Sequence, residues 1–371
     1  MAQAATPSTP IDADAEAARD ALAGRLFESA AGAFDLAAVY MGDRLGLYRA
    51  LDASGAQSSP ELAARTGLQE RYVREWLEQQ AVTGILSADD EPDGGIRRYS
   101  LPVGHREVLL DELSLAYATP TARAIAVAMR MLPQIMAAFE HGGGVSWSDY
   151  GPDLREAQAA TNRPLFHNIL GSEWLPAIAD VHARLLADPP ARIADVACGE
   201  GWSSIAMARA YPKVRVDGID LDEPAIAQAR RNAAETEVAD RVSYHARDAA
   251  DPALQGAFDL VTIFEAVHDL SQPVAVLGAC RGLLAPGGTM LVADERVSET
   301  FTAPGDFVER MMYGYSLTVC LTNGLADTPS VGTGTVMRPA TLERYALAAG
   351  FSRVTVLPIE HETFRIYRLD P

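Results

Sequence analysis

The sequence predicts an α/β protein in which a C-terminal, doubly wound and mostly parallel sheet follows a mainly helical N-terminal domain. From residue 191 onward, short apolar runs typical of strands alternate with helical segments, which is the pattern of a parallel sheet with helices on both faces. Before that point the apolar residues recur mainly at helical spacing. Apolar residues make up 48% of the chain, enough for a packed core in each part.

Composition narrows the kinds of partner. A chain of 371 residues is long enough for two domains. The formal net charge of −19 argues against nucleic acid or an anionic membrane as the main partner, because both are bound through basic surfaces. Cys198, Cys280 and Cys320 are far apart, so we predict neither a disulfide framework nor a zinc site. The N-terminal segment lacks the features of a signal peptide, and we expect a cytoplasmic protein.

The N-terminal part has the pattern of a winged helix. Ser59 and Pro60 open a short helix as N-cap and first turn, and Gly67 ends it. A second helix follows over 71–84, and two short extended pieces then flank an Asp-Gly-Gly turn, which is a hairpin signal. Helix, turn, helix and hairpin in this order form a winged helix.

Two roles are open for this winged helix. It is either a packing and dimerisation module or a reader of DNA. The predicted wing carries Asp89, Asp90, Glu91 and Asp93, which would repel phosphate. The charge pattern therefore favours dimerisation.

The C-terminal part alternates strands and helices in order. The expected strands lie at 191–197, 214–220, 241–246, 258–267 and 287–295, with helices over 202–212, 223–235 and 272–284 between them. A late helix at 340–350 precedes a closing pair of strands. Ligands of such open sheets bind at the carboxyl ends of the strands.

The first of these strands leads directly into a glycine turn. Asp195 ends the strand, and Gly199 and Gly201 lie in the turn before the next helix. Glycines at this place let a ligand approach the backbone, and the helix N-terminus favours a negative group. A dinucleotide fingerprint would have a third glycine where this chain has Ser204, so a dehydrogenase is disfavoured.

Acidic residues follow at the ends of the next strands. Asp220 closes the second strand, where an acid accepts hydrogen bonds from ribose hydroxyls. Asp248 and Ala249 follow the third strand, within reach of an adenine amino group, and Glu265 ends the fourth. All these places are carboxyl ends of strands, so the residues are expected at one edge of the sheet.

With these motifs, residues 191–300 resemble class I S-adenosylmethionine (SAM)-dependent methyltransferases. The segment from Asp195 to Gly201 is similar to their first motif, D-x-G-x-G-x-G, with Ala197 in place of the first glycine. Asp220-Leu221 and Asp248-Ala249 are similar to the ribose-binding and adenine-contacting pairs. The resemblance implies a Rossmann-like methyltransferase fold and SAM as cofactor, bound by Asp195, Ala197, Gly199, Gly201, Asp220, Leu221, Asp248, Ala249 and Glu265.

The whole chain resembles small-molecule O-methyltransferases with an N-terminal dimerisation domain, including an actinobacterial winged-helix group. This resemblance implies a homodimer and a small-molecule acceptor. It also implies that His268 and Asp269, after the fourth strand, include the general base, because a hydroxyl acceptor must lose a proton. Asp294 or Glu295 would orient the imidazole. The expected catalytic residues are His268, Asp269 and Glu295, and no metal is expected.

We therefore expect four segments. They are a tail over 1–18, a winged-helix dimerisation domain over 19–106, a helical linker and acceptor-pocket region over 107–188, and a SAM-dependent methyltransferase domain over 189–371. Phe166, Trp174, Phe307, Met311, Met312 and Tyr315 are expected in the acceptor-pocket wall.

The predicted function is methyl transfer from SAM to a small, apolar or aromatic molecule in secondary metabolism. O-methylation is favoured, and methylation at carbon or nitrogen stays open. Two alternatives also stay open, a SAM-binding protein of this fold that catalyses a non-methylating reaction and a winged-helix transcription regulator.

Overall fold

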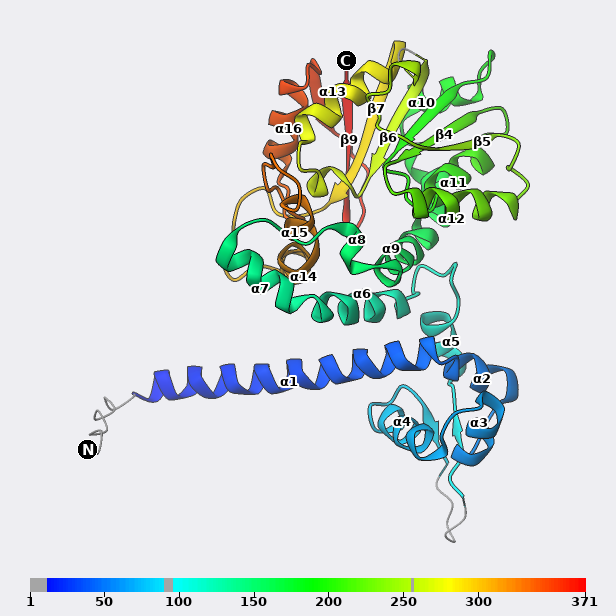
Figure 1. Cartoon of the computed structure of the whole chain (residues 1–371), viewed down its shortest axis with the longest axis vertical. Helices are drawn as coiled ribbons and strands as arrows, with labels where there is room; N and C mark the ends of the chain where they lie inside the picture. Colours follow the sequence, from blue (N-terminus) through cyan, green and yellow to red (C-terminus); the bar gives the residue numbers. More distant parts are fainter. Residues whose placement is uncertain (1–11, 90–95, 255–256) are drawn as a thin grey trace. The chain divides into compact units, whose positions relative to one another are not determined.

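The computed structural model describes residues 12–89, 96–254 and 257–371. The chain forms two compact units, Met1–Leu110 and Asp111–Pro371, and each is described by itself (Figure 1). The sequence analysis placed the end of the N-terminal domain at residue 106, a few residues before the division that the structure has.

The first unit is mainly helical. Its elements are α1 (Ala13–Arg44), α2 (Leu47–Ser54), α3 (Ser59–Thr66), α4 (Glu70–Val82), β1 (Ser87–Ala88), β2 (Tyr99–Ser100) and α5 (Val103–Leu109). Helix α1 begins inside the segment 1–18 that the sequence analysis takes as a tail. The side chain of Asp12 caps it by accepting a hydrogen bond from the backbone N–H of Ala15 at 2.8 Å.

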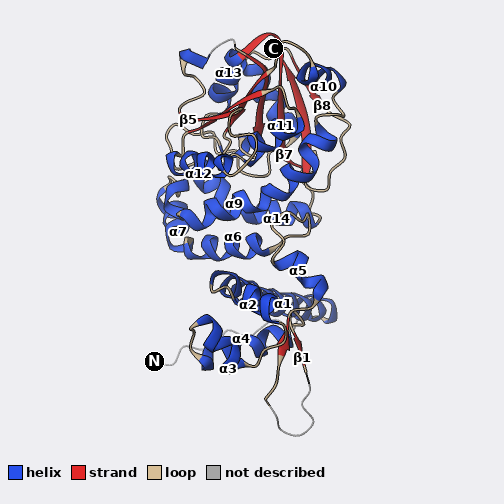
Figure 2. Cartoon of the chain, turned by 90° about the vertical axis from the view of Figure 1, so that its right-hand side faces the viewer, coloured by secondary structure: helices blue, strands red, loops and turns tan. Residues whose placement is uncertain are grey.

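The winged-helix pattern is confirmed, with one correction at its first helix. Ser58, not Ser59, is the N-cap of α3, because the Glu61 carboxylate bonds back to the backbone N–H of Ser58 at 2.8 Å and completes a capping box. Strands β1 and β2 pair antiparallel, as expected for the wing (Figure 2). The Asp-Gly-Gly turn and most of the wing's acids lie outside the described residues.

Helix α1 contributes only its C-terminal end to the core of the first unit. Trp76 of α4 donates from Nε1 to the carbonyl of Ala38 at 2.9 Å and meets Tyr48 edge to face, with ring centroids 5.1 Å apart. Gly42 of α1 faces these rings, since a Cβ there would lie 2.5 Å from Trp76. By contrast, residues 13–31 of α1 are all exposed.

The second unit is a layered α/β domain preceded by helices. The helices before the sheet are α6 (Thr119–Arg130), α7 (Leu132–His141), α8 (Trp147–Tyr150), α9 (Pro152–Leu165), the π-helix η1 (Phe166–Trp174) and α10 (Ala179–Leu186). The strands are β3 (Arg192–Val196), β4 (Arg215–Asp220), β5 (Val242–Ala246), β6 (Phe258–Phe264), β7 (Leu284–Glu295), β8 (Arg353–Val356) and β9 (Phe364–Asp370). The remaining helices are α11 (Trp202–Ala210), α12 (Glu223–Ala234), η2 (Pro252–Leu254), η3 (Val267–Asp269), α13 (Pro273–Leu283), α14 (Phe307–Tyr315), the π-helix η4 (Ser316–Cys320), α15 (Leu321–Gly324) and α16 (Pro339–Ala348).

The sheet has seven strands in the order β5-β4-β3-β6-β7-β9-β8. Strands β3 to β7 run parallel, and β9 pairs antiparallel with both of its neighbours, β7 and β8. The predicted doubly wound, mostly parallel sheet is confirmed. The chain reverses its direction of travel across the sheet between β3 and β6. Such a reversal opens a crevice at the carboxyl ends of those two strands, where ligands bind.

Alternate strand residues fill two cores, one on each face of the sheet. Ile193, Leu260 and Leu291 pack with η1, α10, α11 and α12, whereas Ala194, Val261 and Val292 pack with α13 and α16. Helices therefore cover both faces (Figure 2). Because both faces are buried, the strands read as nearly continuous apolar runs in the sequence.

Among the described residues, no single helix combines the length and apolar character needed to cross a bilayer. The pair α6 and α7 meets both conditions only when counted together, and it is bent by 51° at the break.

Candidate functional site

A buried carboxylate, that of Asp195, stabilises the turn after β3. Asp195 is 1% exposed. Its Oδ2 accepts hydrogen bonds from the hydroxyls of Ser203 and Ser204, each at 2.6 Å, and its Oδ1 accepts one from Thr262 at 2.8 Å. Asp195 therefore ties the start of α11 to β3 and β6, and its contribution in this structure is to shape the turn.

Three residues of the turn have left-handed backbone. Ala197, Gly199 and Gly201 have φ of 55°, 51° and 81°. A Cβ on Gly199 would meet nothing within 4 Å, whereas one on Gly201 would lie 2.4 Å from the Tyr244 hydroxyl. Gly199 thus borders open space that a ligand can approach, and Gly201 is required for close packing. Ala197 accepts the strain that the motif's usual glycine would avoid.

Asp220, at the end of β4, lies next to this turn. Its Oδ2 accepts the backbone N–H of Gly199 at 2.9 Å, and its Oδ1 accepts that of Asp222 at 2.8 Å. Burial raises the pKa of Asp220, and these backbone hydrogen bonds oppose the rise. The acid and the glycine turn that the sequence analysis singled out are therefore brought together, with lone pairs left over for a ligand.

The other predicted contacts after β4 and β5 differ in exposure. Leu221 is 76% exposed, and Asp248 is exposed as well. Ala249 is buried in the core on the α13 side of the sheet. The Asp248 carboxylate accepts the backbone N–H of Ala250 at 2.8 Å, which fixes the turn at the end of β5.

Glu265, directly after β6, has a strained backbone, and hydrogen bonds fix its side chain. Its φ is 51°, an uncommon value for a residue with a Cβ. Oε2 accepts hydrogen bonds from Gln158 Nε2 at 2.9 Å and from Asn162 Nδ2, both on α9. Burial raises the pKa of Glu265 to about 7, which its hydrogen bonds and the charge of His268 partly oppose.

Helix α9 also supplies side chains to this site, which the sequence motifs did not predict. Arg155, one turn before Gln158, donates from Nε to Asp222 Oδ2 at 2.6 Å, and Trp147 Nε1 reaches the same oxygen at 3.2 Å. Residues 155, 158 and 162 lie on one face of α9 and bind residues that follow β4 and β6. The i, i+3, i+7 spacing of these polar residues was the available signal.

His268, in η3, is buried in a cluster of carboxylates. Its side chain is 2% exposed. Nδ1 donates to Asp294 Oδ1 at 2.8 Å and lies 3.0 Å from Glu295 Oε2. Nε2 lies 3.7 Å from Asp269 Oδ1, too far for a hydrogen bond. Of the two acids at the end of the fifth strand, Asp294 therefore makes the closer contact with the imidazole, and the adjacent Asp269 lies farther away.

The charges in this cluster depend on one another. Burial by itself lowers the pKa of His268, but Glu295, Asp294 and Asp269 outweigh it and raise the pKa well above the usual value. Burial likewise favours protonated Asp294, but the charge of His268 outweighs it and lowers the Asp294 pKa. Burial raises the pKa of Glu295 well above its usual value. His268, Asp294 and Glu295 therefore titrate as one interdependent group, in which the charge of each side chain shifts the pKa of the other two.

The same cluster contains donor atoms that suit a metal. One atom each from His268, Asp269 and Cys320 lie within 4.8 Å of one another, and so do atoms of His268, Asp294 and Glu295. Metal binding requires a neutral imidazole and a thiolate. Burial raises the pKa of Cys320 to about 12, and His268 also retains its proton strongly, so both groups oppose binding. That the site takes no metal stays a prediction.

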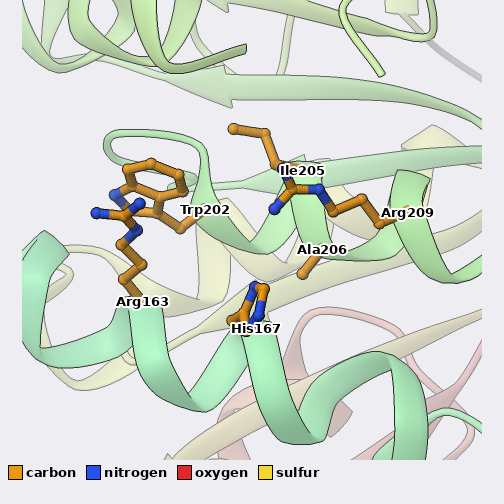
Figure 3. A pocket seen from close by; sticks show the side chains of 6 residues that line it. All are labelled: Arg163, His167, Trp202, Ile205, Ala206 and Arg209. Carbon is orange, nitrogen blue, oxygen red and sulfur yellow. The ribbon is translucent and has the colours of Figure 1, made fainter. Parts of the chain in front are cut away.

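A pocket lies between α11 and the continuous helix formed by α9 and η1 (Figure 3). It is small and partly open to solvent, and its lining comprises Arg163, His167, Trp202, Ile205, Ala206 and Arg209. The Arg163 guanidinium stacks 4.1 Å from the centroid of Trp202. Neither the glycine turn nor Asp220 lines this pocket, so it is separate from the strand-end site.

The expected acceptor-pocket wall is wrong in part. Phe166 and Trp174 are 8% and 2% exposed and belong to the core beneath η1, where Trp174 packs edge to face on Phe364. Phe307 is 74% exposed. Aromatic residues at helical spacing fill cores more often than they line pockets, and this is the case for the first two.

Comparison with known proteins agrees with this geometry. Residues 193–288 match the family described as a methyltransferase domain, and residues 35–109 match the Rv2258c-like winged HTH domain. The fold and the strand-end residues thus define a class I SAM-dependent methyltransferase domain. The chain combines this domain with an N-terminal Rv2258c-like winged-helix domain.

Curated relatives match over part of their length. A ubiquinone biosynthesis O-methyltransferase of Xanthomonas campestris is 38% identical over 120 residues, which are 32% of this chain and 48% of that protein. One from Aromatoleum aromaticum is 29% identical over 181 residues, or 48% of this chain and 71% of that protein. The chain thus spans about half the length of the first of these relatives.

Solved structures share the fold over nearly the whole chain. The mitomycin 7-O-methyltransferase is 21% identical with a TM-score of 0.69, covering 96% of this chain and 99% of that one. Human N-acetylserotonin methyltransferase, solved with SAM, is 17% identical with a TM-score of 0.69, covering 94% and 97%. At these identities the similarity shows the fold.

Proposed function

We propose that this protein transfers the methyl group of SAM to a hydroxyl of a small apolar or aromatic molecule. The observation that carries the proposal is the edge formed by Gly199, Asp220 and Glu265 at the carboxyl ends of three adjacent strands. Open space above Gly199 and free lone pairs on Asp220 suit a nucleoside with two ribose hydroxyls. SAM, when bound, supplies a methyl group activated by a sulfonium.

The residues of this edge have distinct roles in the proposal. Gly199 and Gly201 let the ligand approach the backbone, and Asp220 accepts the ribose hydroxyls. Asp248 and Ala249 contact the adenine, with Leu221 beside it. Asp195 and Ala197 act by shaping the turn.

His268 is the proposed general base. Asp294 holds Nδ1, which leaves Nε2 to take the proton of the acceptor hydroxyl. The surrounding carboxylates raise the pKa of His268, so the neutral imidazole is a strong base for the proton of the acceptor. The same shift means that the imidazolium must first lose a proton before it can act as that base. An acceptor that arrives as an anion would instead pair with the imidazolium. Asp269 and Glu295 help to raise the pKa of His268. Acidic hydroxyls such as phenols fit this site best, because they lose their proton most easily.

Titration calorimetry tests the cofactor role. The full chain should bind SAM and its demethylated product, S-adenosylhomocysteine (SAH). Asp220→Asn should weaken both by roughly tenfold or more, because a charge-assisted hydrogen bond is lost. Asp240→Asn, an exposed acid outside the site, is the matched control. If the wild-type chain binds neither compound, the proposed function is wrong.

A homodimer is part of the proposal. Leu26, Phe27 and Phe34 of α1 are 61%, 77% and 73% exposed in the single chain. A helix with so little packing gains little stability from its own residues, and a second copy of the chain would cover its apolar side chains. The cytoplasmic location stays a prediction from the sequence.

DNA reading by the winged helix is not favoured by the charges on α4. Arg71 pairs with Glu75 at 2.5 Å, and Arg74 pairs with Glu70 at 2.6 Å, so these arginines are already neutralised. A salt-sensitive gel shift with duplex DNA would support the alternative of a transcription regulator. A mass gain of one methyl group in a panel of phenols incubated with SAM would separate methyl transfer from a non-methylating reaction.

A further inference from the structure

In the described part of the chain, two non-glycine residues have positive φ. They are Ala197 and Glu265, and each directly follows one of two neighbouring parallel strands, β3 and β6. Ala197 belongs to the glycine turn, so the SAM site accounts for it. Glu265 is less readily explained, because residues with a Cβ seldom adopt this strained conformation. Strain of this kind persists where the surroundings fix a side chain for a purpose.

The surroundings of Glu265 do fix it. Gln158 and Asn162 both donate to Oε2, and among the described residues no hydrogen bond is made to Oε1. Gln158 and Asn162 are one turn apart on α9, so the helix presents both amides together. Arg155, on the same face, binds Asp222 and fixes the helix to the loop after β4. The carboxylate is thus held by one oxygen, with the other available.

The position of Glu265 relative to Asp220 indicates which part of a bound cofactor would lie near Oε1 of Glu265. The two acids follow β6 and β4, which flank β3, so they are separated by two strand spacings, about 10 Å. The proposed function places the adenine at Asp248, after β5, and the ribose at Asp220, so the sulfonium end of the donor would extend the other way, toward β3 and β6. That end is cationic in SAM, whereas in SAH the sulfur is neutral.

We propose that Glu265, positioned by Gln158 and Asn162, is the residue by which this site prefers the charged methyl donor over its neutral demethylated product. This inference rests on the proposed function and adds a specificity role to it. A carboxylate near a sulfonium attracts SAM but not the sulfur of SAH, so the product leaves more easily. At an effective dielectric of about 20, two opposite unit charges about 4 Å apart interact by more than a tenfold preference requires.

Calorimetry on the full chain tests the proposal with SAM, SAH and sinefungin, which carries an ammonium where SAM has the sulfonium. Glu265→Gln keeps the size of the side chain and an oxygen for both amides. It should weaken SAM and sinefungin by roughly tenfold and change SAH by less than about threefold. The double variant Gln158→Ala/Asn162→Ala should lower the same preference partly. Glu265→Asp should retain more of it than Glu265→Gln.

Glu140→Gln is the control, since Glu140 is an exposed acid on α7 that lies beside His141. It should leave the preference for SAM over SAH unchanged. If Glu265→Gln weakens SAM and SAH equally, Glu265 contacts a group that both share, and the proposal is overturned. No change in either affinity overturns it as well. If the wild-type chain binds neither compound, the proposed function itself fails. Thermal unfolding shows whether each variant is folded, and the double variant provides the test if Glu265→Gln is not.

Discussion

The imidazole of His268 and the carboxylate of Asp294 form a 2.8 Å hydrogen bond in which the two side chains are 2% and 1% exposed. Removing His268 would leave Asp294 buried without its counter-charge, whereas removing Asp294 would leave the imidazole beside Glu295 and Asp269. The pair therefore acts as one titrating unit, and its pKa values depend on Glu295, Asp269, Glu265 and Cys320, which face it from β7, η3, the end of β6 and η4.

Asp294→Asn should shift the pH profile of methyl transfer to a phenol toward lower pH by about one unit or more. The reason is that the variant removes one of the carboxylates that raise the pKa of His268, so the neutral imidazole forms at lower pH. The wild-type rate should still be rising above neutral pH. NMR titration of the imidazole gives the same pKa without relying on turnover. Asp327→Asn, an exposed acid, should leave both profiles unchanged, and an unshifted Asp294→Asn profile would contradict the assignment.

Asp195→Ala should destabilise the second unit by about 3 kcal/mol, because three buried hydroxyls lose their common acceptor. A domain of this size should then melt roughly 5–10 °C lower in calorimetry. The exposed pair of Asp188 with Lys213 gives the comparison, since Asp188→Ala should cost less than about 1 kcal/mol. Equal melting temperatures for the two variants would show that Asp195 is not the support of the turn.

The preference for SAM over SAH should fall between about pH 8 and pH 6. Burial raises the pKa of Glu265 to about 7, so its carboxylate is charged above that pH and neutral below it. His268, Asp294 and Tyr315 face it as well, but Gln158 and Asn162 carry no charge. Glu265→Gln should show a flat ratio of the two dissociation constants over this range. A wild-type ratio that does not change with pH would contradict the prediction.

The sequence predicted much of this site because its motifs are local. The turn at Gly199 and Gly201 and the acid Asp220 each follow a strand directly, and parallel strands bring their carboxyl ends together without further information. The partners from α9 could not be predicted in this way. Gln158 and Asn162 precede Glu265 by about a hundred residues, and which helix covers the strand ends depends on packing. The same limit explains Phe166 and Trp174, whose aromatic character fits a core as well as a pocket wall.

Leu26→Asp combined with Phe34→Asp should convert a dimer to monomer. The two side chains are 61% and 73% exposed in the single chain, and burying each against a second copy would contribute about 1.5–3 kcal/mol per subunit. Analytical ultracentrifugation of the full chain at micromolar concentration measures the change in mass. Glu28→Gln, on the same exposed stretch of α1, should leave the mass of the wild type. A wild-type monomer, or a dimer that withstands both aspartates, would show that α1 is not the dimer interface.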